Sequence, residues 1–219
     1  MKEMSQTLRK IRKKERIIEV AASMLENQDY NEIRIENISA RFKMAKTMVF
    51  YYFDSKAALY LAVLEKLHLD TALDFREELK KFELQDYESL KKYIMSMTHK
   101  YIQDHYLLIK LLDCEERIYS EALPQQIMEA SKKIDAAYDE LLSDILQKSN
   151  FLTRNELFYI FEVQRHFLRG YYRQMMSHVK YFTSVNSYDH DFERKSLYEF
   201  RVLRMLRYFF DGIVANAKK

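Results

Sequence analysis

Few side chains in the sequence have the spacing that metal binding or catalysis requires. Glu65 and His68 form a Glu-x-x-His pair, which puts a carboxylate and an imidazole on one face of a helix. Helical di-metal sites need this motif twice, together with two further Glu residues, and no other histidine follows a Glu by three residues. We therefore expect no metal and no cofactor, and a helical metal-dependent enzyme is kept as an alternative interpretation.

Phosphate-loop and nucleophile chemistry have even less support. Gly170 and Gly212 are the two glycines of the chain, and two distant glycines cannot build a glycine-rich phosphate-binding loop. Cys114 is the single cysteine, so an internal disulfide is impossible, which fits a reducing cytoplasm. Its position between Leu112 and Glu115 favours a small core residue over a redox site. The prediction is a cytoplasmic protein that is not an enzyme.

A different chemistry is indicated by cations, hydroxyl groups and aromatic rings that lie close together between residues 34 and 56. Lys, Thr and Tyr side chains carry hydrogen-bond donors that suit phosphate oxygens and base edges. The candidate nucleic-acid contacts are Arg34, Lys43, Lys46, Thr47, Phe50, Tyr51, Tyr52 and Lys56. Phe50 has no hydroxyl group, so it either touches nucleic acid through its ring or only packs.

Charge is distributed unevenly along the 219 residues. Residues 1–60 hold twelve Lys or Arg against eight Asp or Glu, and the remaining residues hold 24 against 25. The positive excess is densest from Lys2 to Arg16, with seven basic and two acidic side chains. A basic end on a neutral body suggests a region that faces nucleic acid, and the alternative is a solvated tail.

Helices must position these side chains. The chain has two glycines and one proline, Pro124, whereas sheet proteins need turn residues every few positions. Apolar residues recur every three or four positions, which is typical of amphipathic helices, and no apolar run approaches the ~20 residues that span a membrane. The predicted fold class is all-α. The predicted helices are one with Leu8, Ile11, Ile18, Ala22 and Leu25 on its apolar stripe, ending near Asn27, then Ile35–Phe42, Ala45–Tyr52, Ser55–Phe82, Tyr87–His105, Tyr106–Tyr119, Gln125–Lys148, Arg154–His178 and Phe192–Ala217.

Three helices in about the first 50 residues, the second and third joined by a very short turn, are typical of a helix-turn-helix. Helices that cross closely need a small residue at their contact, and Ala40 is expected there. Met44 is expected to fill the turn, and Val49 to anchor the next helix on the core. Lys46, Thr47, Phe50 and Tyr51 would then face outward, where they suit a phosphate-lined groove.

At these residues the chain resembles the TetR/AcrR family of bacterial helix-turn-helix transcriptional regulators. The stretch Ile-Ile-Glu-Val-Ala-Ala at 17–22 is similar to that family's first helix. The stretch Val-Phe-Tyr-Tyr-Phe-Asp-Ser-Lys at 49–56 is similar to its aromatic-rich recognition helix and to the Ser-Lys that opens its fourth helix. The resemblance extends over about residues 10–65. It implies a DNA-binding dimer whose C-terminal part senses a small molecule.

Four positions depart from the family pattern. Lys43 stands where Gly is usual in the turn, which predicts either a strained backbone or a different turn geometry. Ala45 stands where Ser caps the recognition helix, Arg34 where Thr or Ser caps the second helix, and Thr47 where a smaller residue is usual. Base-contact rules therefore do not transfer, and the operator sequence cannot be deduced.

The last two predicted helices are the most apolar, and their apolar faces are wider than a single stripe. A helix that needs burial on two sides packs both on its own core and on a partner. The family's C-terminal helix pair forms a four-helix dimer interface, so the resemblance implies a homodimer, the alternative being a monomer in which these helices are central. The expected interface residues are Phe161, Leu168, Tyr172, Leu203, Leu206, Phe209 and Phe210.

The middle helices are rich in Met and Tyr. Met is adaptable and polarisable, which suits a pocket for apolar ligands, although each such residue is also typical of an ordinary core. The candidate ligand contacts are Tyr93, Met97, Tyr101, Leu111, Tyr119 and Met128.

These observations predict a helix-turn-helix domain at residues 1–54, with a basic tail at 1–8, and a helical ligand-sensing and dimerisation domain at 55–219. The predicted function is transcriptional repression, with a palindromic double-stranded DNA operator released when a small apolar or amphipathic molecule binds. A helical adaptor that binds only protein is the second alternative, and the basic N-terminus and the aromatic Ser-Lys motif argue against it.

Overall fold

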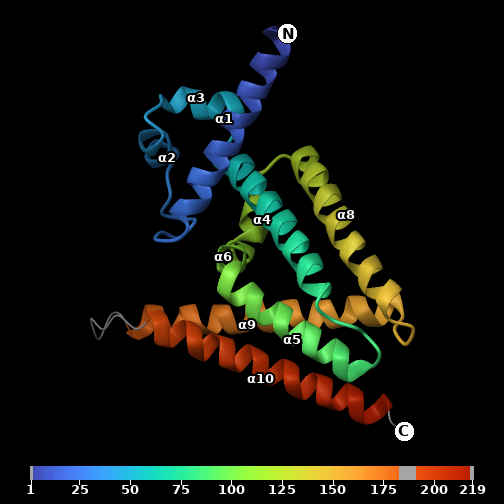
Figure 1. Cartoon of the computed structure of the whole chain (residues 1–219). Helices are drawn as coiled ribbons and strands as arrows, with labels where there is room; N and C mark the ends of the chain where they lie inside the picture. Colours follow the sequence, from blue (N-terminus) through green and yellow to red (C-terminus); the bar gives the residue numbers. More distant parts are fainter. Residues whose placement is uncertain (1, 183–190, 218–219) are drawn as a thin grey trace. The chain divides into compact units, whose positions relative to one another are not determined.

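The computed structural model describes residues 2–182 and 191–217, which form ten helices (Figure 1). No strand occurs in this described part, and the predicted all-α fold is confirmed. The helices are α1 (Lys2–Met24), α2 (Ile35–Arg41), α3 (Lys46–Tyr52), α4 (Lys56–Leu79), α5 (Tyr87–Asp104), α6 (Tyr106–Asp113), α7 (Glu115–Glu121), α8 (Pro124–Lys148), α9 (Arg154–Phe182) and α10 (Asp191–Ala217).

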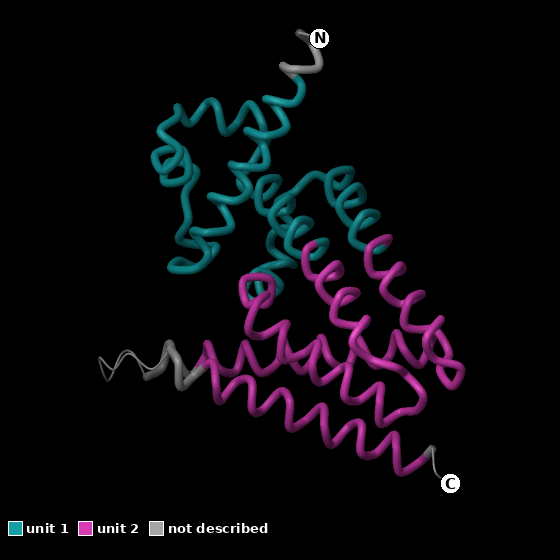
Figure 2. Tube along the Cα trace, viewed as in Figure 1, with its two compact units in different colours: residues 1–69, 110–135 teal, residues 70–109, 136–219 magenta. Residues whose placement is uncertain are grey.

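The chain divides into two compact units, which Figure 2 colours separately. Unit 1 comprises residues 1–69 and 110–135, and unit 2 comprises residues 70–109 and 136–219. Helices α4, α6 and α8 each contribute residues to both units. The compact units therefore do not follow the predicted functional boundary after residue 54, which stays a prediction.

Within unit 1, helices α1, α2 and α3 are held by apolar side chains at helical spacing. Ile17 and Ala21 of α1, Ile38 of α2 and Val49 of α3 are all fully buried. Helix α2 packs against both α1 and α3. The predicted anchor role of Val49 is thereby confirmed, because its burial fixes which side of α3 faces outward.

Two details of the predicted packing are wrong. Ser39, not Ala40, is the buried small residue of α2, because Ile35, Ile38 and Ser39 share one helical face and Ala40 lies about 100° further round. On α1 the buried stripe begins only at Ile17, so Leu8 and Ile11 are 50% and 47% exposed.

The segment expected to be a tail is also part of α1, which is helical from Lys2 onward. Residue 1 lies outside the described residues. In Figure 1 the first turns of α1 project beyond α2 and α3.

The turn between α2 and α3 has the geometry of a Schellman motif. Lys43 N–H donates to the Ala40 carbonyl and Met44 N–H donates to the Ser39 carbonyl, both at 3.0 Å. Lys43 has φ 52°, the left-handed conformation that this motif requires and that favours glycine. Of the two geometries that the sequence left open, the strained backbone is the one observed.

Two helix starts follow local sequence signals. Ser55 Oγ accepts a hydrogen bond from Ala58 N–H at 2.9 Å and so caps α4. Helix α8 begins at Pro124, one residue before the predicted start at Gln125, and proline suits the first turn because its missing N–H costs no hydrogen bond there. The single helix predicted from Tyr106 to Tyr119 is instead two helices, since Cys114 has ψ 3° and interrupts the run between α6 and α7.

In unit 2, helix α10 packs against α5 and α9 (Figure 1). The buried residues of α10 recur every four positions and therefore form one face. They are Tyr198, Val202, Leu206, Phe210 and Val214. Among the described residues, no helix has the length and apolar content needed to cross a membrane.

Both glycines lie inside helices and are exposed, Gly170 in α9 and Gly212 in α10. A Cβ atom added to either would meet no atom within 4 Å. A glycine in a helix interior costs about 1 kcal/mol relative to alanine. Packing within the described chain therefore gives no reason for glycine at these two positions.

Candidate nucleic-acid interface

Helix α3 displays most of the predicted nucleic-acid contacts on its outer side. Lys46, Thr47, Phe50 and Tyr51 are exposed, Tyr51 by 64%, and Tyr52 is partly exposed. A short helix thus presents an ammonium group, hydroxyl groups and aromatic rings together. These are donors and surfaces that suit phosphates and base edges in a groove.

Glu36 of α2 is a neighbour of this surface that the sequence analysis missed. Its carboxylate pairs with Lys46 Nζ at 2.5 Å, with the two side chains 56% and 49% exposed. The hydrogen bond from Lys46 lowers the pKa of Glu36. An exposed ion pair contributes little to stability, so Lys46 can exchange Glu36 for another anion at small cost.

Cations of α1 adjoin the aromatic residues of α3 and its end. Lys10 Nζ lies 5.0 Å from the centre of the Tyr51 ring, and Lys14 Nζ lies 5.4 Å from that of Phe53. The rings of Tyr51 and Tyr52 meet edge to face, with centres 5.1 Å apart. The basic charge of α1 is therefore continuous with the exposed surface of α3.

Lys56 lies differently from the other predicted contacts. Its ammonium group donates to the Tyr30 carbonyl and lies 4.1 Å from the centre of the Tyr30 ring. Burial lowers the pKa of Lys56. The Tyr30 hydroxyl in turn donates to Glu121 at 3.2 Å, and burial raises the pKa of Tyr30. A phosphate contact by Lys56 stays a prediction, and it requires the ammonium group to leave Tyr30.

Two further predicted contacts, Arg34 and Lys43, are exposed at the two ends of α2. Arg34 occupies the N-cap position of α2 and Ala45 that of α3, and neither side chain makes a capping hydrogen bond. Neither helix start is therefore capped by the side chain of its own N-cap residue.

Three of the six predicted ligand contacts share one face of α5 in unit 2. Tyr93, Met97 and Tyr101 are spaced by four residues and are all buried. The Tyr93 hydroxyl donates to the Phe75 carbonyl at 3.1 Å. This face is an apolar wall with few polar atoms left to bind a ligand.

A buried polar pair next to this face was missed by the sequence analysis. Gln164 of α9 donates from Nε2 to Thr98 Oγ1 at 2.7 Å, and Thr98 donates to the Ile94 carbonyl at 2.6 Å. Gln164 and Thr98 are 3% and 0% exposed. An amide in an apolar core has no short-range sequence pattern that would mark it.

The other three predicted ligand contacts belong to unit 1. Leu111 is buried in α6, and the Tyr119 hydroxyl donates to Glu115 at 3.1 Å. Met128 of α8 is 65% exposed. The six residues thus divide equally between the two units.

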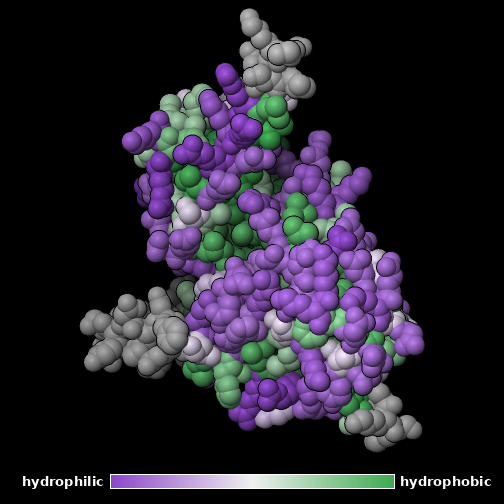
Figure 3. Space-filling view, in the orientation of Figure 1, coloured by the Kyte–Doolittle hydropathy of each residue, from purple (hydrophilic) through white to green (hydrophobic). Residues whose placement is uncertain are grey.

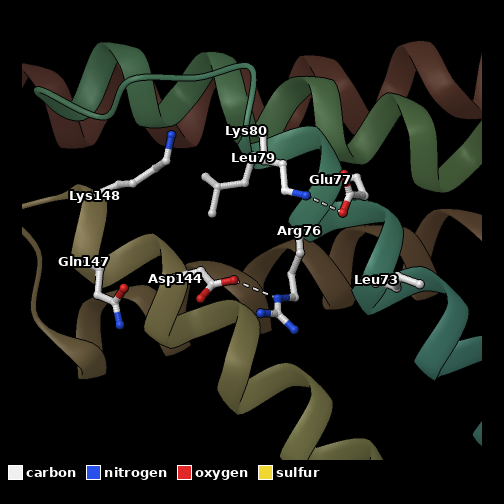
Figure 4. Close-up of a pocket in the computed structure, with 8 residues that line it drawn as sticks. All are labelled: Leu73, Arg76, Glu77, Leu79, Lys80, Asp144, Gln147 and Lys148. Atoms are coloured by element: carbon white, nitrogen blue, oxygen red, sulfur yellow. Dashed lines mark hydrogen bonds and ion pairs between the residues drawn. The ribbon is translucent and has the colours of Figure 1, made fainter.

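A cavity of about 410 Å³ lies in unit 2 at the C-terminal ends of α4 and α8 (Figure 4). Its charged groups are paired, Arg76 with Asp144 at 2.7 Å and Lys80 with Glu77 at 2.6 Å. None of the predicted ligand contacts lines it. Its lining residues are Leu73, Arg76, Glu77, Leu79, Lys80, Asp144, Gln147 and Lys148.

The predicted dimer-interface residues are mostly covered by their own chain. Leu168, Tyr172, Leu206 and Phe210 are buried, so they have almost no surface left to cover against a partner. The remaining three, Phe161, Leu203 and Phe209, are partly exposed.

The exposed apolar side chains of α9 and α10 are different residues. Figure 3 shows hydrophobic surface between hydrophilic residues along α10, the lowest helix in this view. Arg204 lies against two of these side chains, with its guanidinium carbon 5.9 Å from the ring centre of Phe200 and 5.5 Å from that of Tyr208. The exposed set is Phe158, Tyr159, Leu197, Phe200 and Tyr208.

The Glu-x-x-His pair of α4 is occupied by ordinary contacts. Glu65 pairs with Lys133 at 2.7 Å, and His68 is buried. Across the described residues, no three His, Cys, Asp or Glu side chains gather in a way that could hold a metal ion.

Residues 17–63 match the sequence model of the bacterial regulatory proteins of the tetR family. Among curated proteins, no sequence matches this one. The fold is similar to that of a TetR-family transcriptional regulator from Mesorhizobium loti MAFF303099, with TM-score 0.56 and 14% identity over 93% of this chain and 98% of that one.

Two further solved structures have lower TM-scores. The TetR family repressor AlkX from Dietzia sp. strain DQ12-45-1b has TM-score 0.41 and 15% identity over 88% of this chain and 94% of that one. A TetR-family transcriptional regulator from Bordetella parapertussis 12822 has TM-score 0.43 and 19% identity over 88% and 93%. From the match at residues 17–63 and the fold shared with the Mesorhizobium loti protein, residues 17–63 are a helix-turn-helix region of the tetR family of bacterial regulatory proteins, and the chain has the fold of a TetR-family regulator.

Proposed function

We propose that this chain is a homodimeric, cytoplasmic transcriptional repressor that leaves a palindromic DNA operator when a small apolar or amphipathic molecule binds. The observation that carries the proposal is the outward display of Lys46, Thr47 and Tyr51 on α3, with Val49 buried behind them. In helix-turn-helix proteins the second helix of the motif enters the major groove with its N-terminal residues on base edges.

The contacts are assigned by position along α3. Lys46 and Thr47 open the helix and are assigned to base edges, since Lys suits the acceptors of guanine and Thr suits several bases. Tyr51 and Tyr52, one turn later, are assigned to phosphates through their hydroxyl groups. Phe50 has only a ring to offer and is assigned to packing against the sugar-phosphate backbone.

Dimerisation is assigned to the exposed faces of α9 and α10. Phe200 and Tyr208 are 57% and 53% exposed on α10, and Phe158 and Tyr159 are exposed on α9. Clustered exposed aromatic residues mark interaction sites in soluble proteins. A two-fold dimer would place two recognition helices about 34 Å apart, in successive major grooves, and so require an inverted repeat.

Ligand sensing is assigned to the region beside α5. Thr98 and Gln164 supply the polar atoms there, next to the apolar face of Met97 and Tyr101. A ligand that displaces the Gln164–Thr98 hydrogen bond can replace it with its own donor or acceptor, while its apolar part contacts α5. We expect Gln164→Leu to weaken effector binding while operator binding in the absence of effector is kept.

The test is selection of binding sites from random-sequence duplex DNA. The wild-type chain should enrich an inverted repeat, and Thr47→Ala should relax the preference at one base pair of each half-site, with a loss of about 1–3 kcal/mol. Lys132→Ala, an exposed cation of α8, is the matched control and should leave the selected sequence unchanged. A chain that binds no duplex at any salt concentration would indicate the protein-only adaptor instead.

Regulation has a separate test. A small molecule that copurifies with the chain, identified by mass spectrometry, should bind more weakly when operator DNA is present. Linkage requires that operator DNA lower the affinity of the chain for the molecule by the same factor by which the molecule lowers its affinity for operator DNA. This factor is typically about 5- to 150-fold. Equal affinities with and without operator would remove that molecule as the effector.

A further inference from the structure

Residues 7–16 of α1 bury no side chain in unit 1. All of residues 7–16, here termed the basic segment, are exposed, and burial of α1 begins only at Ile17. The basic segment is about 15 Å long at 1.5 Å per residue. It lies outside the part of the chain that matches the tetR family, which begins at residue 17.

The basic segment carries six cations and one acidic residue, Glu15. Their spacing of i, i+3, i+4 and i+7 places four of the cations on one face of the helix, and the other two stand beside them. The four are Arg9, Arg12, Lys13 and Arg16, and the other two are Lys10 and Lys14. Among the side chains of residues 7–177 and 195–216, no acidic group forms an ion pair with any of the six.

This charge is joined to the surface of α3. Lys10 lies over the ring of Tyr51 in α3 at 5.0 Å, and Arg16 lies over the ring of Phe42, which ends α2, at 5.3 Å. A polyanion that reaches Tyr51 therefore meets the basic segment next. Like charges along one helix repel each other, and an anionic partner relieves that repulsion.

We infer that the basic segment is a second DNA-binding element, which contacts the phosphate backbone beside the groove that α3 enters. The inference rests on the proposed function. Duplex DNA carries one negative charge for every ~1.7 Å of its axis, so about 15 Å of helix lies alongside several phosphates. Phosphate contacts carry no sequence information, so the segment adds affinity and footprint length without changing base preference.

The experiment compares two triple variants with the wild-type chain. Arg9→Ala/Arg12→Ala/Lys13→Ala removes three cations of the basic segment and keeps a good helix former at each position. Lys80→Ala/Lys92→Ala/Lys132→Ala removes three exposed cations elsewhere and is the matched control. The probes are the selected operator and a random-sequence duplex of about 30 base pairs, close to three helical turns. Affinity is measured as a function of salt concentration, and the footprint is mapped by hydroxyl-radical cleavage.

The basic-segment variant should lose up to about three units of the slope of log affinity against log salt. Its affinity for the two probes should fall by the same factor, and the sequence it selects should be unchanged. Protection at the flanks of the footprint should be lost. Arg9→Lys/Arg12→Lys/Lys13→Arg, which keeps the charges, should restore the slope, and this separates charge from a local folding defect.

A basic-segment variant with the wild-type slope and footprint would overturn this inference alone, provided that the wild-type chain binds operator. A loss of affinity for the operator but not for the random-sequence duplex, with altered base preference, would also overturn it, since phosphate contacts act on all sequences. A wild-type chain that binds no duplex would overturn the proposed function as well.

Discussion

Lys43 occupies a backbone conformation that is unfavourable for any residue with a Cβ atom. Its φ of 52° is imposed by the two hydrogen bonds that close the turn after α2. We expect Lys43→Gly to raise the free energy of unfolding by about 1 kcal/mol, because the steric cost of the left-handed conformation exceeds the added flexibility of the unfolded chain. Urea denaturation measures this. Lys43→Ala keeps the Cβ atom, and equal stabilisation by both variants would contradict the explanation.

His105, at the end of α5, makes the stability of the chain depend on pH. Its Nε2 lies 3.0 Å from the Asp74 carboxylate, and its ring packs against Phe75 and Tyr101. Burial lowers the pKa of His105, and Asp74 only partly offsets this. The unfolded chain therefore takes up a proton near pH 6.5, and the folded chain does so only at lower pH.

Stability must then fall as pH decreases through this window, because the unfolded state binds more protons there. We expect His105→Gln to lose less stability than the wild-type chain between about pH 7.5 and about pH 5.5, measured by urea midpoints. An identical loss in the two chains would assign the pH dependence to other groups.

Helices α6 and α7 hold the connection between α1 and α2. Lys110 of α6 donates to the Leu25 carbonyl, just beyond the end of α1, where a cation is also favoured by the helix dipole. Arg117 of α7 donates to Asn31 at 2.5 Å, and Glu121 accepts from Tyr30 at 3.2 Å. These contacts tie the loop ahead of α2 to the two helices.

Replacing Lys110 by Met keeps the apolar stem and removes the donor. We expect a loss of about 1 kcal/mol in the free energy of unfolding and, under the proposed function, a smaller effect of the ligand on operator affinity. Denaturation and operator titration measure the two effects, with Lys132→Met as control. Unchanged stability in Lys110→Met would show that the hydrogen bond to Leu25 contributes nothing.

Sequence patterns predict helices well where the signal is local, and they fail where the answer depends on a distant partner. Ser55 and Pro124 mark the starts of α4 and α8 through their own chemistry. The break at Cys114 has no Gly or Pro beside it, so nothing in the local sequence separates α6 from α7. Leu8 and Ile11 fit the period of an apolar stripe, but the core of unit 1 does not extend to them.

The same distinction applies to the candidate site. The outward face of α3 was predictable because Val49 and the turn fix it locally. The contact of Lys56 with Tyr30 was not, because the partner lies 26 residues earlier in the chain. On α10, periodicity identifies a wide apolar face, yet it cannot distinguish the part that the chain covers itself, such as Leu206, from the part left exposed, such as Phe200.

At the scale of the whole molecule, the exposed aromatic residues of α10 make oligomeric state the decisive measurement. We expect the wild-type chain to sediment as a dimer at micromolar concentration. The double variant Phe200→Glu/Tyr208→Glu should sediment as a monomer and lose specific operator binding, because it places four charges in a two-fold interface. Both residues are exposed in the single chain, so its fold should be unaffected.

Leu123→Glu is the matched control, since Leu123 is 58% exposed outside α9 and α10. It should leave the dimer intact. A wild-type chain that sediments as a monomer would contradict the assignment, as would dissociation by the control variant.

For protein engineering, the empty space beside Gly170 and Gly212 bears on both the stability of the protomer and the association of two protomers. Alanine at both positions would meet no atom of its own chain and would stabilise the two helices by about 2 kcal/mol together, or about 4–8 °C in melting temperature. The same two methyl groups would stand on exposed sides of α9 and α10, the helices to which we assign dimerisation. A thermostabilised protomer and a tightly associating one would therefore call for different residues at the same two places.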